Sequence, residues 1–498
     1  MPQIIASVFA ESREQVLRQA AKAAMAGADW LELRLDRWPL NVDLRPAIAP
    51  VQLPVLATCH TPENGGRFRG TLGERRELLT SALLAGAQGL DLDLHDNWAP
   101  PAGRTRLRLL MRSFHSFTGV PRELPEIHRQ LMATSGAVAK IAVTAHDLAD
   151  AAPLLELLRG IDQAATPTVA FAMGRTAWPT RLLALCHGAP FVFGCIEAGE
   201  ETAVGQVPVA LLAGLYRARE LGPATAIYGL LGNPALHSLG PWLHNRAFRR
   251  LGVDGVYLPF ETSRPEAVVE MLPAARVRGL SVTAPFKATL RKRCERLSDD
   301  AAATDVVNTL VATTDDGRFV GFNTDIDGVR AALAPFVDAD REVAGGDRDA
   351  VVLGAGGAAR AAAIALLGMG FRVTMLGRTL DGVREFAATH GIRLGSLSQT
   401  LPDGLEPGVV VQATPLGSVG RDPEERPLPE WQPAPATIVL EMVYRPARTR
   451  FLRDAAAAGA RTIAGVEMFL AQAAAQVRRF SGQVLAPDEL RAFLAGVT

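Results

Sequence analysis

The sequence predicts an α/β protein in which an N-terminal (β/α)8 barrel precedes a second α/β region with a dinucleotide-binding unit. Three observations support this prediction. From residue 3 to about residue 195, the chain repeats a short apolar segment, a polar loop and an Ala- and Leu-rich segment. The same alternation resumes after Thr225. Residues 350–360 read A-V-V-L-G-A-G-G-A-A-R, an apolar run that breaks into glycines before a helical segment, as a dinucleotide-binding turn does.

Length and composition exclude several classes of protein. A chain of 498 residues is long enough for two or three domains. Its 52 basic residues balance 52 acidic residues, so no net charge favours a nucleic acid or an anionic membrane as a partner. No apolar run is long enough to span a bilayer, and the N-terminus lacks the basic region of a secretory signal. We therefore expect a cytoplasmic protein without a membrane partner.

Cysteine and histidine usage predicts no structural metal. The four cysteines, Cys59, Cys186, Cys195 and Cys294, form neither a close pair nor a metal-binding motif. We expect them to be reduced thiols. The nine histidines also lack ligand spacing.

The first region contains about eight predicted strands, at residues 4–9, 30–36, 54–59, 89–94, 107–113, 138–143, 168–173 and 191–195. Strands that alternate with helices indicate a parallel sheet, and eight in this length suit a closed barrel. An open doubly wound sheet is the alternative. In a barrel, polar side chains at the carboxyl ends of the strands line the active site.

Polar residues interrupt these apolar strands at particular points. Glu32, Arg34 and Asp36 share one face of the second strand because side chains alternate along a strand. The fifth strand ends near His115, and Lys140 lies inside the apolar sixth strand. We expect burial to lower the pKa of Lys140 and free its amine to form a Schiff base, with His115 as proton shuttle. Structural roles are the alternative for both residues.

Residues 1–215 resemble the type I 3-dehydroquinate dehydratases. The motifs are E-L-R-L-D from Glu32, S-F-H at His115, A-K-I-A at Lys140, M-G at Met173 and T-A-V-G-Q ending at Gln206. The resemblance implies that Lys140 forms an imine with the substrate ketone. It implies that His115 removes the adjacent proton and later protonates the departing hydroxyl. It also implies substrate-binding roles for Glu32, Arg34, Arg181, Thr202 and Gln206.

Three positions depart from this family pattern. His60 stands where an Arg is common, Asn64 where an acidic residue is common, and Ser116 where Asp or Asn is common. His115 would then lack an orienting carboxylate. The hypothesis is a dehydratase activity that is present but weakened.

The second region begins after a predicted helix at residues 207–221, which Gly222 and Pro223 end. Lys287 follows an apolar run, and Asp325 ends the motif G-F-N-T-D. A lysine and an aspartate in one cleft suit carbonyl reduction, since one group can protonate the ketone oxygen while hydride arrives from a nicotinamide. A structural ion pair is an equal alternative from spacing alone.

The glycine-rich turn predicts the cofactor. Gly354 permits a tight turn, Gly356 lets the backbone approach a pyrophosphate, and the small Ala359 lets helix and strand pack closely. The next strand, residues 372–376, leads to Arg378 rather than to an acidic residue. An arginine there suits a 2′-phosphate, so we expect NADP. A solvated arginine is the alternative.

Residues 225–498 resemble the shikimate dehydrogenases, through G-N-P-x-x-H-S, S-V-T-A-P-F-K, V-V-N-T-L, N-T-D, G-A-G-G-A-A-R, G-R-T, A-T-P-L-G and E-M-V-Y-R-P. The resemblance implies that Lys287 and Asp325 are the catalytic pair. It implies that the substrate lies near Ser238, Thr283, Asn308, Tyr444 and Gln472. It implies that the cofactor contacts Gly354, Ala355, Gly356, Gly357, Ala358, Arg378, Thr379, Thr414, Met442 and Gly465.

Three residues depart from the shikimate dehydrogenase pattern. Gly240 replaces the second Ser of S-x-S-P, and Ser281 and Gln412 stand where Asn is common. The lack of a side chain at Gly240 predicts extra space and a looser selection, so that quinate is accepted beside shikimate.

The two resemblances together imply a bifunctional enzyme of the shikimate pathway, which leads to chorismate and the aromatic amino acids. It would dehydrate 3-dehydroquinate to 3-dehydroshikimate through a Lys Schiff base and reduce that product to shikimate with NADPH. We expect a dehydratase barrel at residues 1–220, a substrate domain at 225–328 plus 466–498, and a Rossmann NADP-binding domain at 329–465. The alternatives are a relaxed quinate/shikimate dehydrogenase and a metabolite-sensing regulator with weakened catalysis.

Overall fold

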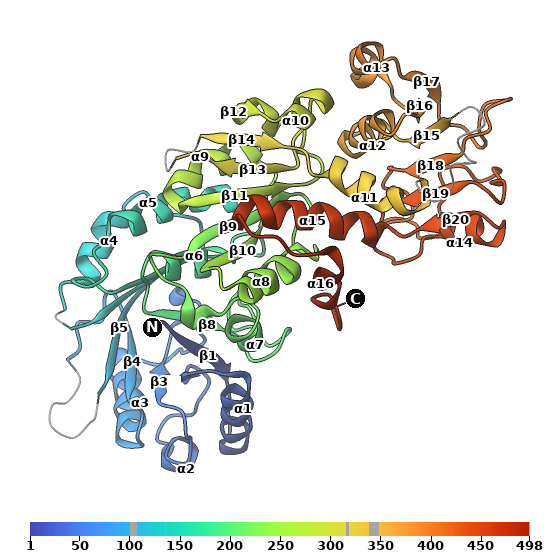
Figure 1. The fold of residues 1–498 in the computed structure, drawn as a ribbon. Helices are drawn as coiled ribbons and strands as arrows, with labels where there is room; N and C mark the ends of the chain where they lie inside the picture. The colour runs from blue at the N-terminus through green and yellow to red at the C-terminus, as the bar shows by residue number, and fades with distance from the viewer. Residues whose placement is uncertain (100–106, 135, 315–317, 338–347, 498) are drawn as a thin grey trace. The chain divides into compact units, whose positions relative to one another are not determined.

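A computed structural model describes residues 1–99, 107–134, 136–314, 318–337 and 348–497 (Figure 1). Two compact units are formed. One contains Met1–Gly229, Pro234–Pro241 and Asp254–Val277, and the other contains Leu230–Asn233, Trp242–Val253 and Arg278–Thr498. Among the described residues, no helix has the length and apolar character needed to cross a membrane. The predicted division into domains at residues 220, 328 and 465 stays a prediction.

The first unit contains the predicted barrel. In the described part of this region, eight strands form one sheet in the order β7-β6-β5-β4-β3-β2-β1-β8, and neighbouring strands run parallel. The strands are β1 (Gln3–Phe9), β2 (Trp30–Arg34), β3 (Val55–Thr58), β4 (Gly89–Asp93), β5 (Leu109–Ser116), β6 (Val138–Thr144), β7 (Thr168–Met173) and β8 (Phe191–Gly194). The sheet is nearly closed, so the barrel prediction is confirmed.

Helices follow the strands, as the repeating pattern predicts. They are α1 (Arg13–Ala26), α2 (Arg45–Ile48), α3 (Leu72–Leu84), α4 (Leu124–Leu131), α5 (Ala152–Gly160), α6 (Thr180–Cys186) and α7 (Val209–Ala213). Apolar side chains from the barrel strands, including Ile5, Met111 and Phe193, form a buried cluster, which leaves the strand ends for polar residues.

The helix predicted at residues 207–221 is wrong in length. It ends at Ala213, and a single 3-10 turn, η3 (Ala218–Glu220), follows. Between them, Tyr216 packs edge-on against Trp178 with ring centroids 5.5 Å apart, and Arg217 has a φ of 50°. A residue with a positive φ cannot continue a right-handed helix.

A second sheet of the described chain has six strands in the order β10-β9-β11-β13-β14-β12. It is mixed, since β13 runs antiparallel to both β11 and β14, whereas β12 and β14 run parallel. The strands are β9 (Ala226–Gly232), β10 (Gly255–Glu261), β11 (Val277–Val282), β12 (Cys294–Leu297), β13 (Thr309–Ala312) and β14 (Phe319–Phe322). The helices are α8 (Gly240–Leu251), α9 (Pro265–Ala275), α10 (Asp299–Thr304), α11 (Asp325–Val337), α15 (Gly465–Ser481) and α16 (Pro487–Ala492).

A third sheet holds the glycine-rich turn. Six described strands lie in the order β17-β16-β15-β18-β19-β20 and run parallel. The strands are β15 (Asp349–Leu353), β16 (Arg372–Gly377), β17 (Arg393–Ser396), β18 (Val409–Gln412), β19 (Ile438–Glu441) and β20 (Arg461–Ile463), with helices α12 (Gly357–Gly368), α13 (Arg384–His390) and α14 (Arg450–Ala457). Numbered along the chain, this order is 3-2-1-4-5-6, the doubly wound arrangement of dinucleotide-binding sheets.

Two candidate active sites

A cavity of about 530 Å³ opens at the carboxyl ends of the barrel strands. Its lining includes Glu32 and Arg34 of β2, His115 of β5, Lys140 of β6 and Met173 of β7. The strand pairing explains why they meet, because Ser113 lies opposite Lys140 and places His115 one pleat further along. The alternation seen in the sequence therefore points these polar side chains into one space.

Two carboxylates surround the Lys140 amine. Its Nζ donates a hydrogen bond of 2.6 Å to Asp91 Oδ2 and lies 3.6 Å from Glu32 Oε1. Glu32 also accepts hydrogen bonds from Ser7 Oγ at 2.5 Å and Thr58 Oγ1 at 3.0 Å. The Nζ further lies 4.4 Å from the centroid of the Phe193 ring.

The expectation that burial would depress the pKa of Lys140 is wrong. Burial does lower the pKa, but Asp91 and Glu32 outweigh it, and the pKa is raised above its ordinary value. The resting amine is an ammonium because two buried carboxylates stabilise its charge. It must lose a proton before it can act as a nucleophile.

His115 has the opposite electrostatic character. Burial, then the neighbouring His60 and Lys140, lower its pKa well below the ordinary value. Among the described residues its Nδ1 has no hydrogen-bond partner, and its ring stacks near Phe117 at a centroid distance of 6.3 Å. This neutral imidazole is chemically suited to accept a proton. Among the described residues, no carboxylate accepts a hydrogen bond from His115 Nδ1.

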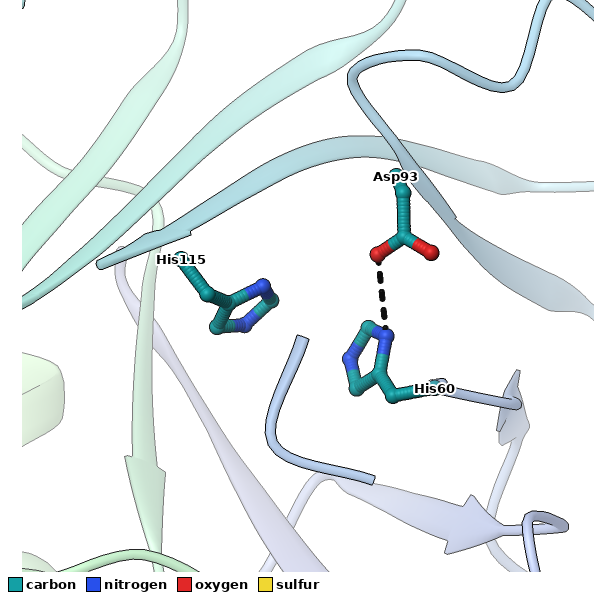
Figure 2. Close-up of side chains that lie close together, drawn as sticks. All are labelled: His60, Asp93 and His115. Carbon is teal, nitrogen blue, oxygen red and sulfur yellow. Dashed lines mark ion pairs between the residues drawn. The ribbon is translucent and has the colours of Figure 1, made fainter. Parts of the chain in front are cut away.

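A second imidazole lies beside His115 (Figure 2). The ring centroids of His60 and His115 are 4.6 Å apart with the ring planes inclined at 66°, and His60 Nδ1 lies 3.0 Å from Asp93 Oδ1. Donor atoms of His60, Asp93 and His115 all lie within 4.8 Å of one another. In the described chain, this is the one group of three such side chains close enough to hold a metal ion. Imidazole and carboxylate ligands of this kind suit Zn²⁺.

Arg181 supplies an unpaired cation at the cavity. It is buried, its Nε donates to Gly205 O at 3.0 Å, and its guanidinium lies 4.1 Å from the centroid of the Phe171 ring. Neither Nη1 nor Nη2 has a hydrogen-bond partner in the described part of the chain, and burial lowers the pKa of Arg181 to about 9. A planar guanidinium with two free nitrogens fits a ligand carboxylate.

The loop after β8 also reaches the cavity. Thr202 N–H and Oγ1 both donate to Gln206 Oε1, at 2.8 and 3.2 Å. Gly205 lies against Gly174, where a Cβ would stand 2.4 Å from the Gly174 carbonyl oxygen. Thr202 and Gln206 therefore line the cavity on a loop that packs closely against the end of β7.

Sequence reasoning missed Asp91 and Asp93 as members of this site and treated His60 only as a departure. The signal was present in G-L-D-L-D, where Asp91 and Asp93 alternate with leucines as Glu32 and Arg34 do on β2. Asp93 is further held by an ion pair with Arg75 of α3.

The second candidate site centres on Lys287 and Asp325, which form an ion pair. Asn308 Nδ2 donates to Asp325 Oδ1 at 2.8 Å, and Asn308 Oδ1 accepts from Thr324 N–H at 2.8 Å. Gln472 Oε1 lies 3.5 Å from Thr324 Oγ1. Four predicted site residues are therefore linked through one network of hydrogen bonds.

Other predicted substrate contacts are anchored by backbone hydrogen bonds or by packing. Thr283 N–H donates to Leu231 O at 2.9 Å, and the Tyr444 ring stacks on Phe469 at a centroid distance of 4.6 Å. Ser238 Oγ accepts from the Gly240 N–H at 3.0 Å. Their contacts with a substrate stay predictions.

A side chain at position 240 would contact two neighbouring residues. A Cβ at Gly240 would stand 3.3 Å from Ser238 Oγ and 3.4 Å from the Tyr257 ring. These distances describe a side chain at position 240 and not the substrate, so the acceptance of quinate stays a prediction. The other two departures have local partners: Ser281 Oγ donates to Gln476 Oε1 at 2.8 Å, and Gln412 Oε1 accepts from Thr414 N–H at 2.6 Å.

The glycine-rich turn fits a dinucleotide. Gly354 has a φ of 123°, and a Cβ there would lie 3.1 Å from Ala413 O. A Cβ at Gly356 would meet nothing within 4 Å, so the backbone before α12 is open to a phosphate. At Gly357, a Cβ would lie 3.2 Å from Lys287 Cδ. The turn thus packs directly against the lysine of the second site.

The other predicted cofactor residues differ in their exposure to solvent. Arg378 and Thr379 are exposed just after β16, and Thr414 and Met442 are partly buried after β18 and β19. Gly465 begins α15, where a Cβ would stand 2.4 Å from Val443 O. These positions follow the carboxyl ends of strands in the third sheet, whose order reverses at β15.

Glu441, at the end of β19, should make the stability of the folded protein depend on pH. Burial raises its pKa to about 7, despite hydrogen bonds from Val443 N–H and Thr449 Oγ1 at 2.9 and 2.8 Å. The ordinary pKa is about 4.3, so the folded protein binds more protons than the unfolded chain between about pH 4.3 and 7. Stability therefore falls as the pH rises through this window, and the full penalty persists above it.

We expect Glu441→Gln to raise the stability above about pH 7 by up to about 3 kcal/mol and to change it little near pH 4. Urea unfolding of both proteins, followed at several pH values, measures the difference. Glu430→Gln, at an exposed residue, is the control. An equal effect of Glu441→Gln at every pH would contradict the assignment.

The fold and the two sites define the class of protein: a two-site α/β enzyme, with a buried amine in a (β/α)8 barrel and a lysine–aspartate pair at a dinucleotide-binding turn. The chain belongs to the family of bifunctional 3-dehydroquinate dehydratase/shikimate dehydrogenases. Residues 4–223 match the type I 3-dehydroquinase family, and residues 230–310 match the shikimate dehydrogenase substrate binding domain.

Individual relatives cover one or both parts. A chloroplastic bifunctional 3-dehydroquinate dehydratase/shikimate dehydrogenase of Arabidopsis thaliana is 31% identical, over 98% of this chain and 83% of that protein. A shikimate dehydrogenase (NADP(+)) of Pyrococcus abyssi is 35% identical, over 51% of this chain and 92% of its own length. The crystal structure of shikimate 5-dehydrogenase from Thermus thermophilus with NADP(H) and shikimate is 32% identical, with a TM-score of 0.46, over 54% of this chain and 98% of that one.

Proposed function

We propose that the chain dehydrates 3-dehydroquinate to 3-dehydroshikimate in the barrel and reduces 3-dehydroshikimate to shikimate with NADPH at the second site. The observation that carries this proposal is the pair of separate lysine sites, each with the partner groups that its reaction needs. Lys140 shares a cavity with His115 and an unpaired Arg181. Lys287 is paired with Asp325 against the glycine-rich turn.

In the barrel, the Lys140 amine attacks the substrate ketone and water leaves, which gives an iminium. The iminium withdraws electrons from the neighbouring carbon and acidifies its proton. Neutral His115 takes this proton and then delivers it to the departing hydroxyl, which leaves as water. Arg181 holds the substrate carboxylate, while Glu32 and Arg34 bind hydroxyl groups. Hydrolysis of the iminium frees the product and Lys140.

At the second site, NADPH supplies a hydride when bound. Gly354 and Gly356 would let the backbone approach its pyrophosphate, and Arg378 would bind its 2′-phosphate. Lys287 donates a proton to the ketone oxygen, and Asp325 holds Lys287 and a substrate hydroxyl in position. Asn308 fixes Asp325 through its 2.8 Å hydrogen bond. Thr283, Gln472, Ser238 and Tyr444 bind the remaining polar groups of the ring.

The test is to mix the purified chain with 3-dehydroquinate and NADPH and follow the absorbance of NADPH. We expect oxidation after a lag in which 3-dehydroshikimate forms. If 3-dehydroshikimate is reduced but 3-dehydroquinate is not consumed, the barrel assignment is wrong. If neither substrate reacts, the chain is the sensing regulator instead. The cytoplasmic location stays a prediction, and the Arabidopsis relative is chloroplastic.

A further inference from the structure

His60 occupies a central position that the reaction described above does not use. Its side chain is buried just after β3 and contacts groups from neighbouring strands. Nδ1 lies 3.0 Å from Asp93 Oδ1, and Nε2 lies 4.0 Å from Asp91 Oδ2. On its other side is the His115 ring, 4.6 Å away, and Figure 2 shows both imidazoles beside Asp93.

The resting state of Lys140 creates a need for a proton acceptor. The ammonium donates to Asp91 Oδ2 at 2.6 Å, so this oxygen is the first atom that can receive its proton. Burial raises the pKa of Asp91, but Lys140 and then His60 and His115 outweigh it and hold the pKa well below its usual range. Asp91 is therefore too weak a base to keep the proton and must pass it on.

The position of His60 suits the next transfer. The same Asp91 oxygen that binds Lys140 lies 4.0 Å from His60 Nε2, and a shift of about 1 Å brings the two atoms to hydrogen-bond distance. Asp93 favours the tautomer with the proton on Nδ1, which leaves the Nε2 lone pair available to accept a proton. Arg75 pairs with Asp93 from α3 and holds it in place.

We propose that His60 is a proton-relay residue that activates Lys140: it accepts the ammonium proton through Asp91 and returns it during imine formation. This proposal rests on the dehydratase function proposed above. It divides the proton transfers between two imidazoles, since His60 serves the formation of the imine and His115 serves the removal and return of the substrate proton.

The steps balance. The Lys140 ammonium gives one proton to His60 through Asp91, and the free amine attacks the ketone carbon as the carbonyl π bond breaks. A second nitrogen proton moves to the new alkoxide oxygen and gives a neutral carbinolamine. The His60 imidazolium then protonates its hydroxyl, the C–O bond breaks, and water leaves. The product is the iminium, with one proton on nitrogen and the same net charge as at the start.

Several charged and titratable groups face His60. Asp91 and Asp93 approach from β4, His115 from β5 and Lys140 from β6, and Arg75 acts through Asp93. The imidazole therefore lies between two carboxylates and the positive charge of Lys140.

The test measures the rate at which the Lys140 adduct forms. The full-length chain is mixed rapidly with 3-dehydroquinate, quenched with borohydride at successive times, and the adduct is quantified by mass. Near neutral pH we expect His60→Gln to slow adduct formation by about 10²-fold while the final yield is retained. The difference between the two chains should narrow as the pH rises toward the pKa of Lys140, because a larger fraction of the amine is then free. The exposed His95, changed to Gln, should match the unmodified chain.

Two further measurements separate a relay from a structural role. Imidazole added to His60→Ala should restore part of the rate, because it can occupy the vacated space and carry the proton. A chelator should leave the unmodified chain unchanged. The relay is overturned if His60→Gln forms the adduct at the unaltered rate, or if its rate falls by the same factor at every pH. A slower rate of the unmodified chain after chelation would also overturn it, in favour of a metal at His60, Asp93 and His115. An unmodified chain that forms no adduct would instead overturn the dehydratase function.

Discussion

Lys140→Arg abolishes the dehydratase reaction, with an expected loss on the order of 10⁴-fold or more, and leaves the shikimate dehydrogenase reaction intact. A guanidinium keeps the positive charge that Asp91 and Glu32 stabilise, but it cannot form an imine with a ketone. Arginine is therefore a better test than alanine. Lys140→Ala would leave two buried carboxylates without their cation, at a cost of about 3–5 kcal/mol.

The loss of the dehydratase reaction is measured by the consumption of 3-dehydroquinate and by borohydride trapping. The shikimate dehydrogenase reaction is measured in the same sample by NADP-dependent oxidation of shikimate. Lys22→Arg, at an exposed ion pair with Glu197, is the matched control. Residual trapping in Lys140→Arg, or a parallel loss of shikimate oxidation, would show that the barrel chemistry has been assigned to the wrong amine.

Lys287→Met lowers the rate of 3-dehydroshikimate reduction by about 10²–10⁴-fold, the range that general acid–base groups contribute. The methionine side chain can fill the volume beside Gly357, where Lys287 Cδ packs. Asp325 retains its 2.8 Å hydrogen bond from Asn308, so the neighbouring carboxylate is not left without a partner. We expect the loss in kcat to exceed any change in KM, because the proton is needed in the transition state.

Steady-state kinetics with NADPH give both parameters, and borohydride trapping at Lys140 reports that the barrel is still folded. The exposed Lys292 provides the control variant, Lys292→Met. A kcat that stays at the unmodified value would make Lys287–Asp325 a structural ion pair, the alternative that spacing alone left open.

Local sequence predicted most of the barrel. The eight strand positions were confirmed because short apolar runs between polar loops identify buried parallel strands. Period-two alternation predicted the inward direction of Glu32 and Arg34, and the apolar strand around Lys140 singled out that residue; all three line one cavity. The helix at residues 207–221 was too long because its end depends on the packing of Tyr216 against Trp178, which is distant in sequence.

Local sequence pattern alone thus predicted the succession of strands and helices in the barrel. It also predicted the glycine-rich turn and which polar residues lie at the strand ends. Only the tertiary structure decided the protonation state of Lys140, because Glu32 and Asp91 reach it from two other strands. It likewise decided that His60 meets His115, and that Ser238 and Tyr257 lie beside Gly240. Charge and packing act through distances between atoms, and residues far apart in the sequence acquire those distances only on folding.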